Sequence, residues 1–504
     1  MQTRISAGLI ALVVLWGLVS PATLGSCFNT MLAVVTRNFG WFYLWVVLGL
    51  VVLALMLAVS RYGDLKLGTD DDEPEFSLSS WFAMLFAAGM GIGLVYWGVA
   101  EPLSHFTVPP PGVAPHTPEA ANTAMRYAFF HWGLHPWAIY SIVALSIAYF
   151  HFRRGSVALI SSATETLPWP WVRRLSPVFN VMAVVATAFG VAASLGIGAA
   201  QINSGLHSVF GLPMGNVWQA GIILVVTLLF MTSAVSGVER GIKWLSQANL
   251  LAAILLAMAV FFLGPTVAIL DTFSNTLGSY LSEVVRMSLR LTPFRDSDWI
   301  GGWTIFYWAW WISWSPFVGL FIARISKGRT IREFLFGVVI VPTLVGFLWF
   351  SIFGGTALNM QIFQGAQLTY VATKDSSLAL FEVLNRLPLS AVTSAVATLL
   401  VVIFFVTSGD SATLVLATMS QNGNPAPPNR SKILWGILVS GIALALMMAG
   451  GLKAVQTAVI VFALPFAVVL SLMALALLRA VRRDWKDEQR QQREWRRKMR
   501  TLVQ

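Results

Sequence analysis

The sequence predicts an all-α integral membrane protein with about twelve transmembrane helices, and its composition supports this fold class. Of the 504 residues, 57% are hydrophobic and only 11% are charged, whereas a soluble domain carries roughly 25% charged residues. Uncharged apolar runs such as residues 41–60 are long enough to cross a bilayer core of about 30 Å. The single cysteine, Cys27, excludes an intrachain disulfide framework and a thiolate metal cluster.

Apolar runs of spanning length follow one another along the chain. Because backbone polar groups in lipid must be satisfied internally, we expect each run to form a helix. The first run follows MQTRIS and lacks a small-residue cleavage site, so we expect a retained helix rather than a signal peptide. The predicted spans lie near residues 5–25, 41–60, 80–100, 129–152, 178–201, 217–237, 249–271, 302–324, 333–354, 388–419, 432–450 and 456–480.

Basic residues predict the orientation of these spans. The connections on one side of the membrane hold about twice as many Lys and Arg residues as those on the other side. An even number of helices places both termini on one side, which the positive-inside rule identifies as the cytosol. We therefore expect a multi-pass protein of the plasma membrane, the inner membrane of a prokaryotic cell, with both termini cytosolic.

The chain ends in a strongly basic tail. More than half of the net charge of +11 falls between residues 479 and 504, directly after the last apolar run. This placement gives no reason to expect a nucleic-acid partner. A basic segment beside the membrane is typical of a cytosolic tail that touches anionic lipid, and a tail that is merely solvated explains the same charges.

Two connecting segments are not predicted to span the membrane. Residues 108–120, VPPPGVAPHTPEA, are rich in proline and predict an ordered external loop. Residues 275–290 have their leucines and valines on one helix face, so this segment is predicted to lie along the membrane surface. A plain surface helix on the protein is the alternative.

Two spans depart from the Leu, Val, Ala and Ile composition of the others. The third carries Gly89, Gly91 and Gly93, although glycine destabilises a helix interior. The eighth holds a cluster of tryptophans before Pro316. Each would begin a block of five helices, and interrupted segments at corresponding positions of two halves indicate a secondary transporter's binding site. A small-residue packing face is the alternative for the glycines.

Aromatic residues of the fourth and eighth spans supply a second signal. Trp137 and Tyr140 share a helix face near Trp132, with Pro136 expected to kink the helix, and Trp311 and Trp314 are also three residues apart. Interfacial belts are the usual place for tryptophan. Facing tryptophans deep in a bundle would instead form a cage that holds a quaternary ammonium group by cation–π attraction, without a carboxylate counter-ion.

Polar residues of the tenth span supply a third signal. Thr407 and Ser408 are adjacent hydroxyls, and hydroxyl and carbonyl oxygens are hard ligands of the kind that sodium takes. Hydrogen bonding of these hydroxyls to their own helix is the alternative. Glu101 and Asp410 are the acids that stand out within the spans, and an intramembrane acid is a functional candidate by default. Asp410 equally suits a structural hydrogen bond.

These residues belong to segments that resemble the signature segments of the betaine/choline/carnitine transporter family. The segments are GMGIGLVYWGVAEP (89–102), FHWGLHPWAIY (130–140) and FYWAWWISWSPFVGLFIARISKGRTIREF (306–334). The resemblance extends over about residues 30–480 and is greatest to sodium-coupled glycine betaine members. It implies a homotrimer, transport by alternating access and sodium as the coupling ion, with no other cofactor.

The resemblance also implies a division of the chain. Two N-terminal helices would precede two inverted five-helix repeats with discontinuous first helices. The predicted regions are residues 1–79 for the N-terminal helices and a cytosolic loop, 80–271 for the first repeat, 272–301 for the amphipathic surface helix and loop, 302–480 for the second repeat, and 481–504 for the basic cytosolic tail.

Site residues follow from the same resemblance. The aromatic box for the trimethylammonium group maps onto Trp132, Trp137, Tyr140 and Trp311, with Trp314 on the cytosolic path and with Met90, Gly91 and Gly93 beside the substrate. One sodium site maps onto Ala87, Met90, Phe404, Thr407 and Ser408, and a second onto Thr187 and Phe317. At the second site the sequence departs from its relatives, which can have a threonine where this chain has Val191.

The predicted function is sodium-coupled symport of glycine betaine, or a related quaternary ammonium or zwitterionic osmolyte, into the cell. Proton-linked choline relatives carry an aspartate at the position of Gly93, so this glycine favours sodium and a zwitterion that brings its own carboxylate. The alternatives are a proton-coupled choline transporter, a carrier of ectoine, proline, carnitine or dimethylsulfoniopropionate, and a channel. We expect no enzyme, because the sequence has no nucleophile elbow, zinc-ligand spacing or P-loop.

Overall fold

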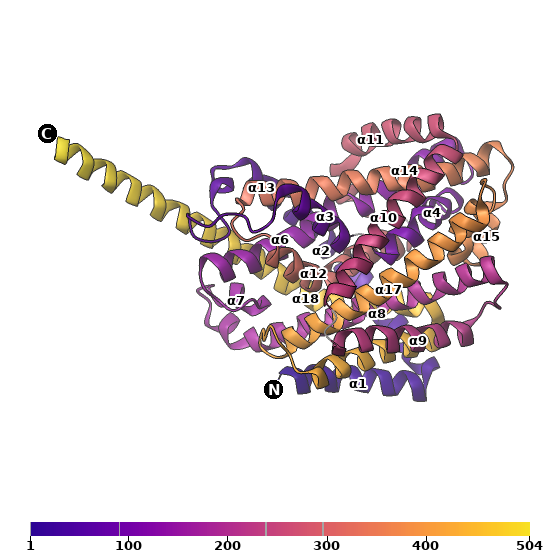
Figure 1. Cartoon of the computed structure of the whole chain (residues 1–504), viewed down its shortest axis with the longest axis horizontal. Coiled ribbons are helices and arrows are strands. Elements are labelled where there is room, and N and C mark those ends of the chain that lie inside the picture. The colour runs from indigo at the N-terminus through magenta and orange to yellow at the C-terminus, as the bar shows by residue number, and fades with distance from the viewer. Residues whose placement is uncertain (1, 90, 237–238, 295–296, 504) are drawn as a thin grey trace.

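The computed structural model describes residues 2–89, 91–236, 239–294 and 297–503. Over these ranges it contains helices and one isolated β-bridge between Lys66 and Thr330, without a strand, so the predicted all-α fold is confirmed. In the described part of the chain, 10 helical stretches are long and apolar enough to cross a membrane. Most of the labelled helices run roughly along the long axis of the molecule, and the end of α18 projects beyond it (Figure 1).

The first two predicted spans form α1 (Gln2–Val19) and α2 (Pro21–Val59), and a short helix, η1 (Arg61–Asp64), follows. Ser20 separates the two long helices, and Pro21 opens α2. Proline suits this position because the first N–H groups of a helix have no partner within the helix. With 39 residues, α2 is far longer than its most apolar run.

The third span is interrupted at its glycines, as predicted. The α3 helix (Leu78–Gly89) ends before α4 (Ile92–Thr107) begins, and Gly91 between them has extended backbone with φ −136° and ψ −171°. The Gly91 carbonyl accepts a hydrogen bond from Leu94 N–H at 3.1 Å, which starts the first turn of α4. Met90 lies outside the described residues.

The fourth span is also divided, at Gly133. The α5 helix (Pro118–Trp132) ends there and α6 (Leu134–Ala148) begins, because Gly133 has non-helical backbone with φ −93° and ψ −129°. The prediction of a kink at Pro136 is therefore wrong by three residues. Pro136 lies in the first turn of α6, where a missing N–H costs no helical hydrogen bond. The elements that follow are η2 (Tyr149–Arg153), α7 (Ile160–Thr164), α8 (Pro170–Phe210), α9 (Asn216–Ser236) and α10 (Glu239–Leu263).

The eighth span is not interrupted, so the prediction of a discontinuous helix is wrong here. A π-helical turn, η3 (Gly301–Ile305), leads into α12 (Phe306–Arg324), and the helix continues through Pro316. Pro316 cannot donate to the carbonyl of Ile312, but the Ser315 hydroxyl donates to it at 2.7 Å. This side chain therefore replaces the hydrogen bond that proline removes.

The later part of the chain repeats the pattern of long helices joined by short ones. Its elements are α13 (Ile331–Leu335), η4 (Phe336–Ile340), α14 (Val341–Phe363), α15 (Leu368–Lys374), η5 (Ser376–Leu378), α16 (Ala379–Leu384), α17 (Ser390–Ser420) and α18 (Asn429–Val503). The last of these has non-helical backbone at Gly450 and Gly451. The two predicted spans within α18, at 432–450 and 456–480, are thus separate helices across this kink.

The segment predicted to lie on the surface forms α11 (Thr266–Ser288). It lies along one side of the molecule, next to α14 (Figure 1). Its inner face buries Tyr280 and Met287, whereas Leu281 and Val285 are 60% and 67% exposed. Apolar side chains thus also point outward from α11, which suits a helix in contact with a membrane surface.

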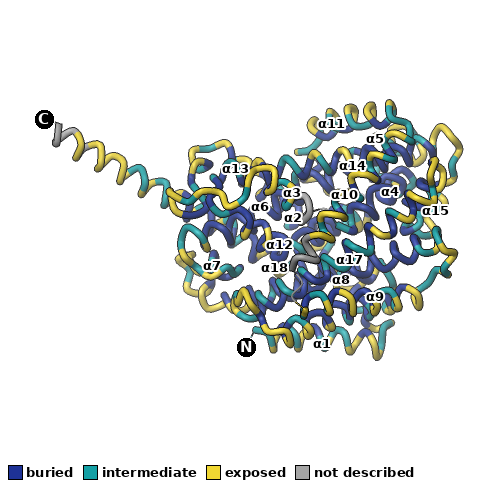
Figure 2. The backbone as a smooth tube through the Cα atoms, in the orientation of Figure 1, coloured by how far each residue is buried: buried dark blue, intermediate teal, exposed yellow. Residues whose placement is uncertain are grey.

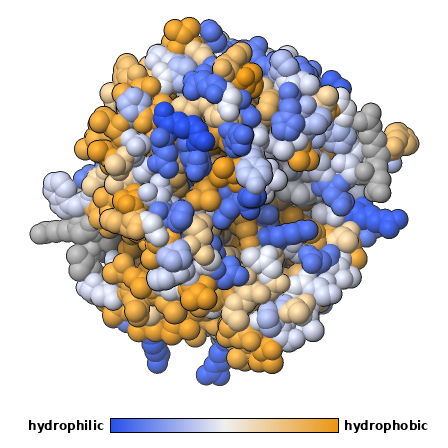
Figure 3. Space-filling view, turned by 90° about the vertical axis from the view of Figure 1, so that its right-hand side faces the viewer, coloured by the Kyte–Doolittle hydropathy of each residue, from blue (hydrophilic) through white to orange (hydrophobic). Residues whose placement is uncertain are grey.

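Burial separates inner helices from outer ones. In their most apolar windows, 94% of the residues in α8 and in the α5–α6 stretch are buried, against 33% in α9 and 17% in α1 (Figure 2). The projecting end of α18 is largely exposed. At the opposite end of the molecule, hydrophilic side chains spread over the middle of the face and hydrophobic ones gather near its margins (Figure 3). The helices that carry the predicted aromatic residues are among the most buried, whereas α17, which carries Thr407 and Ser408, is 44% buried in its most apolar window.

Candidate functional site

Four predicted aromatic residues come together in the interior and form what we call the aromatic box, namely Trp132, Trp137, Tyr140 and Trp311. The ring centroids of Trp132 and Trp311 are 4.8 Å apart with an angle of 74° between the planes. Tyr140 lies 6.2 Å from Trp311 at 77°, and Trp137 lies 5.7 Å from Tyr140 at 79°. All four side chains are buried. Near-perpendicular rings from α5, α6 and α12 are thus grouped at one place.

Hydrogen bonds fix the two tryptophans that meet at the centre of the aromatic box. The Trp311 Nε1–H donates to the His131 carbonyl at 3.0 Å, and the Trp132 Nε1–H donates to Glu101 Oε2 at 2.8 Å. Both indoles therefore have their polar edge occupied by a hydrogen bond, which fixes the orientation of their rings.

The division between α5 and α6 positions these aromatic residues. Trp132 is the last residue of α5, and Trp137 lies in the first turn of α6. A Cβ atom on Gly133 would lie 2.5 Å from the Phe129 carbonyl oxygen and 2.8 Å from Phe347 Cε1. Glycine is needed here because the backbone packs too closely for any side chain.

Gly93 lies directly against the aromatic box. A Cβ atom at this position would lie 2.8 Å from Trp310 Cη2 and 3.1 Å from Trp132 Cη2. Both atoms belong to rigid indole rings, so any side chain at Gly93 would displace them. Gly91, by contrast, has no atom of the described residues within 4 Å of such a Cβ position. The two glycines therefore have different roles: one makes room for the box and the other gives an open, extended backbone.

Trp314 lies one helical turn beyond Trp311. Its Nε1–H donates to the Gly190 carbonyl at 2.9 Å, and its ring contacts Phe317 edge to face at 5.2 Å. The hydrogen bond from Trp314 to Gly190 connects α12 with α8, one helical turn beyond Trp311. Thr187 is one turn from Gly190, and Phe317 is one turn from Trp314, so the two helices present them on adjoining faces.

The predicted second sodium site combines these last two residues. Thr187 is fully buried, and its Oγ1 has no hydrogen-bond partner among the described residues. An unpartnered buried hydroxyl costs free energy unless a ligand occupies it, so Thr187 fits an oxygen ligand of an ion. Val191, one turn further along α8, is also buried and supplies no polar atom.

The first predicted sodium site takes Phe404, Thr407 and Ser408 from α17, a helix that contacts α4. A Cβ atom on Gly198 of α8 would lie 2.9 Å from Ile92 Cδ1 and would also collide with the ring of Phe405, so α8 packs against both of these helices. Met90 and the side chain of Ala87 lie outside what the structure describes.

The hydroxyl of Thr407 bonds to its own helix, as in the alternative interpretation. It donates to the Ile403 carbonyl at 2.9 Å, and Phe404 O lies 3.3 Å away. A hydroxyl that donates one hydrogen still has lone pairs for an ion. Thr407 and Ser408 are both only partly buried.

Asp410 is buried one turn after Thr407, and its Oδ1 has no hydrogen-bond partner among the described residues. It belongs to the stretch of α17 where Gly409 packs against Phe230 of α9. A role in a ligand site and a structural role both suit this position.

The sequence did not identify two further contributors to the site. The Tyr307 ring stacks on Trp311 with centroids 5.8 Å apart and an angle of 21°, and its hydroxyl donates to Glu101 Oε2 at 2.6 Å. Trp310 stacks on Trp311 at 4.9 Å and 14°. Both belong to the tryptophan-rich segment, and the spacing of four residues between Tyr307 and Trp311 is the signal that predicts the first of these contacts.

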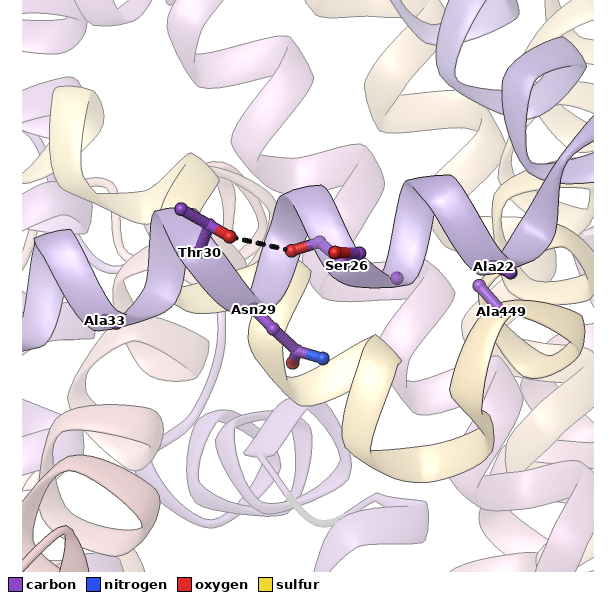
Figure 4. Close-up of a pocket in the computed structure, with 7 residues that line it drawn as sticks. Ala22, Ser26, Asn29, Thr30, Ala33 and Ala449 are labelled. Atoms are coloured by element: carbon purple, nitrogen blue, oxygen red, sulfur yellow. Dashed lines mark hydrogen bonds between the residues drawn. The ribbon is translucent and has the colours of Figure 1, made fainter.

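An open groove on the outer side of α2 is separate from the aromatic box. It has a volume of about 690 Å³ and is lined by small and hydroxyl-bearing residues of α2 together with Ala449 (Figure 4). The Thr30 hydroxyl donates to the Ser26 carbonyl at 3.0 Å within the same helix. The groove contains no aromatic or charged side chain, so it lacks the chemistry that would select a cation.

Comparison with known proteins agrees with this geometry. Residues 3–486 match the family described as BCCT, betaine/carnitine/choline family transporter. The chain is 48% identical over 480 residues to the glycine betaine transporter OpuD of Bacillus subtilis, covering 95% of this chain and 93% of that protein. It is 43% identical over 477 residues to an ectoine/hydroxyectoine transporter of Virgibacillus pantothenticus, covering 94% and 95% respectively. A glycine betaine transporter of Acinetobacter baylyi is 43% identical over 452 residues, covering 89% and 68%.

Proposed function

The chain belongs to the betaine/carnitine/choline family of transporters, and from this premise we propose that it is a sodium-coupled symporter of glycine betaine, or of a closely related osmolyte, into the cell. As a member of this family it is a multi-pass membrane transporter rather than an enzyme. The substrate, the coupling ion and the direction of transport are the parts that we propose here.

The observation that carries the proposed substrate is the aromatic box. Its rings come from α5, α6 and α12, and neighbouring rings meet at near-perpendicular angles. The acid that contacts it, Glu101, is fully buried behind Trp132 and both its oxygens accept hydrogen bonds. A permanent cation is thus bound by ring faces, and a substrate with its own carboxylate needs no counter-charge from the protein.

Ectoine is the second candidate substrate, because one relative at 43% identity is an ectoine/hydroxyectoine transporter. Ectoine is also a zwitterion with a delocalised cationic group, so the same ring faces suit it. Choline lacks a carboxylate, and Gly93 offers no acid to balance its charge.

Uptake of labelled osmolytes by proteoliposomes tests the substrate. The full chain is reconstituted, an inward sodium gradient is applied, and glycine betaine, ectoine, proline, choline, carnitine and dimethylsulfoniopropionate are compared. We expect saturable uptake that is greatest for glycine betaine, with choline at least about tenfold poorer, since a charge left without its partner costs about 1–3 kcal/mol. Uptake that favours choline, or that does not saturate, would contradict the proposal.

Sodium is supported by oxygens on α17 and α8 and by the extended backbone at Gly91. Thr407 and Ser408 are partly buried on α17, a helix that contacts α4, and Gly91 has extended backbone at the interruption before α4. Thr187 adds a buried hydroxyl whose oxygen has no hydrogen-bond partner among the described residues. Hydroxyl and carbonyl oxygens of this kind suit a small hard cation, so we assign Thr407, Ser408, Phe404, Ala87 and Met90 to the first site.

Replacing Thr407 with alanine should raise the sodium concentration for half-maximal uptake by about tenfold, which corresponds to the loss of one oxygen ligand worth about 1.4 kcal/mol. The affinity for glycine betaine at saturating sodium should change little. Thr413→Ala is the matched control, because that hydroxyl also donates to its own helix, to the Asp410 carbonyl at 2.8 Å. Equal sodium curves for wild type and Thr407→Ala would remove Thr407 from the site.

Assembly and orientation complete the proposal. The start of α1 and the end of α18 both lie toward the left in Figure 1, which supports two termini on the same side of the membrane. We propose that this side is the cytosol and that the membrane is the inner membrane. Ten Lys and Arg residues fall between residues 479 and 504 of the sequence, which supports contact with anionic lipid. We expect a homotrimer that works by alternating access, with the interrupted third span next to the substrate.

A further inference from the structure

A buried carboxylate lies directly behind the aromatic box. Glu101 of α4 is fully buried, two helical turns after Gly93. Its Oε1 is 2.6 Å from His131 Nδ1 and 3.1 Å from His105 Nε2. Its Oε2 accepts from Trp132 Nε1–H at 2.8 Å and from the Tyr307 hydroxyl at 2.6 Å. We call these five residues the Glu101 cluster.

The contacts in this cluster satisfy the hydrogen-bonding capacity of the Glu101 carboxylate, which would otherwise be costly to bury. An ionised carboxylate in a membrane interior is strongly disfavoured unless its oxygens are hydrogen bonded. As a carboxylate, Glu101 can only accept, so both histidine nitrogens that face it carry hydrogens. Neighbouring groups on α4, α5 and α12 thus supply the donors.

Two of these donors belong to residues that form or support the aromatic box. Trp132 is a box residue, and the ring of Tyr307 stacks on Trp311. His131 adds a third connection, because its backbone carbonyl accepts the Trp311 Nε1–H at 3.0 Å. Glu101 therefore contacts Trp132 directly, and it contacts two residues, Tyr307 and His131, that in turn contact Trp311.

We propose that Glu101 is a positioning residue for substrate binding, which fixes the indole of Trp132 directly and that of Trp311 through Tyr307 and His131. Their ring faces are then held ready for the quaternary ammonium group. This inference rests on the proposed substrate and names the residue that shapes its site. Glu101 touches the rings from behind and does not itself contact the cation.

The same residues include a set that resembles a metal site. One ligand atom from each of Glu101, His105 and His131 lies within 4.8 Å of the others. The separation of 2.6 Å between His131 Nδ1 and Oε1 is that of a short hydrogen bond. Two ligands of one ion stand farther apart than this, and Oε2 is bonded to Trp132 and Tyr307. The contacts therefore favour a hydrogen-bonded cluster.

Glycine betaine binding to the purified full-length protein, followed by tryptophan fluorescence in saturating sodium, tests the inference. Glu101→Gln keeps the shape of the side chain but replaces one acceptor oxygen by an NH₂ group, which cannot accept the existing donors. We expect its dissociation constant to rise about 10- to 100-fold, the range of a lost hydrogen bond to a charged group. In uptake, KM should rise by the same factor while the maximal rate stays within about twofold.

Two further variants separate positioning from general damage. Tyr307→Phe removes only the hydroxyl that donates to Glu101 and should raise the dissociation constant about three- to tenfold. Glu119→Gln is the matched control, because Glu119 lies at the exposed start of α5 and contacts Arg126 and Thr123. This variant should behave as wild type.

Several outcomes would overturn the inference. Wild-type affinity in both Glu101→Gln and Tyr307→Phe would overturn it, as would a lower maximal rate at unchanged KM. If EDTA lowers the affinity of the wild-type protein for glycine betaine, the residues belong to a metal site instead. If wild type itself does not bind glycine betaine, the proposed function fails, and this inference fails with it.

Discussion

Replacing Trp311 with leucine is expected to abolish glycine betaine uptake at micromolar substrate while the protein stays folded. Trp311 contacts Trp132 and Tyr140 and is thus the residue that joins the two sides of the aromatic box. Leucine removes a cation–π contact worth about 0.5–2 kcal/mol and the hydrogen bond to the His131 carbonyl that holds the ring, worth about 0.5–1.5 kcal/mol. Together these losses correspond to about 5- to 300-fold in affinity.

The measurement is uptake by proteoliposomes, with the elution volume in size-exclusion chromatography as the check on folding and assembly. Trp311→Phe is the matched variant, since it keeps a ring face but loses the N–H donor. It should keep part of the affinity and fall between wild type and Trp311→Leu. Unchanged affinity in Trp311→Leu would refute the aromatic box as the binding site.

Replacing Gly93 with aspartate should change the substrate that the protein transports. The new Cβ would lie 2.8 Å from Trp310 Cη2 and 3.1 Å from Trp132 Cη2, so the rings must shift. The carboxylate would also supply the counter-charge that a cation without its own acid needs. We expect the KM for glycine betaine to rise about tenfold or more, choline uptake to appear, and the dependence on sodium to weaken.

Gly93→Ala separates the effect of volume from the effect of charge. It introduces the same Cβ contacts but no acid, so it should weaken glycine betaine binding without admitting choline. The readout is uptake of both labelled substrates with and without sodium. Strict use of glycine betaine and sodium by Gly93→Asp would count against the role given to Gly93.

Much of this site could be predicted because its residues are unusual where they stand. Glycines are costly inside a helix, so their presence in the third span predicts the interruption seen at Gly91. Tryptophans deep in a span are rare, and the helical spacing of Trp137 and Tyr140 predicts that they face the same way. The structure brings these two together with Trp132 and Trp311.

The parts that could not be predicted depend on contacts between distant residues. Pro316 suggests an interrupted helix, but the hydroxyl of Ser315 occupies the carbonyl that proline leaves free, and α12 continues. Glu101 stands out as an acid in an apolar span, yet Tyr307, which donates to it, is 206 residues away in the sequence. No local pattern encodes such a pair.

The division of the fourth span shows the same limit. A proline within a span predicts a kink, but Pro136 lies in the first turn of α6, where it removes no helical hydrogen bond. The division falls at Gly133, where close packing against Phe129 and Phe347 excludes a side chain. Part of the need for glycine there comes from Phe347 of α14, a helix that lies far along the chain.

Concentrative uptake driven by sodium alone tests the central claim most directly. Proteoliposomes with the wild-type chain receive labelled glycine betaine at equal concentration inside and outside, under an inward sodium gradient and without a proton gradient. The proposed symport predicts accumulation inside the vesicles, which a sodium ionophore abolishes and a protonophore leaves intact. Equilibration without accumulation, or accumulation that follows only a proton gradient, would contradict it.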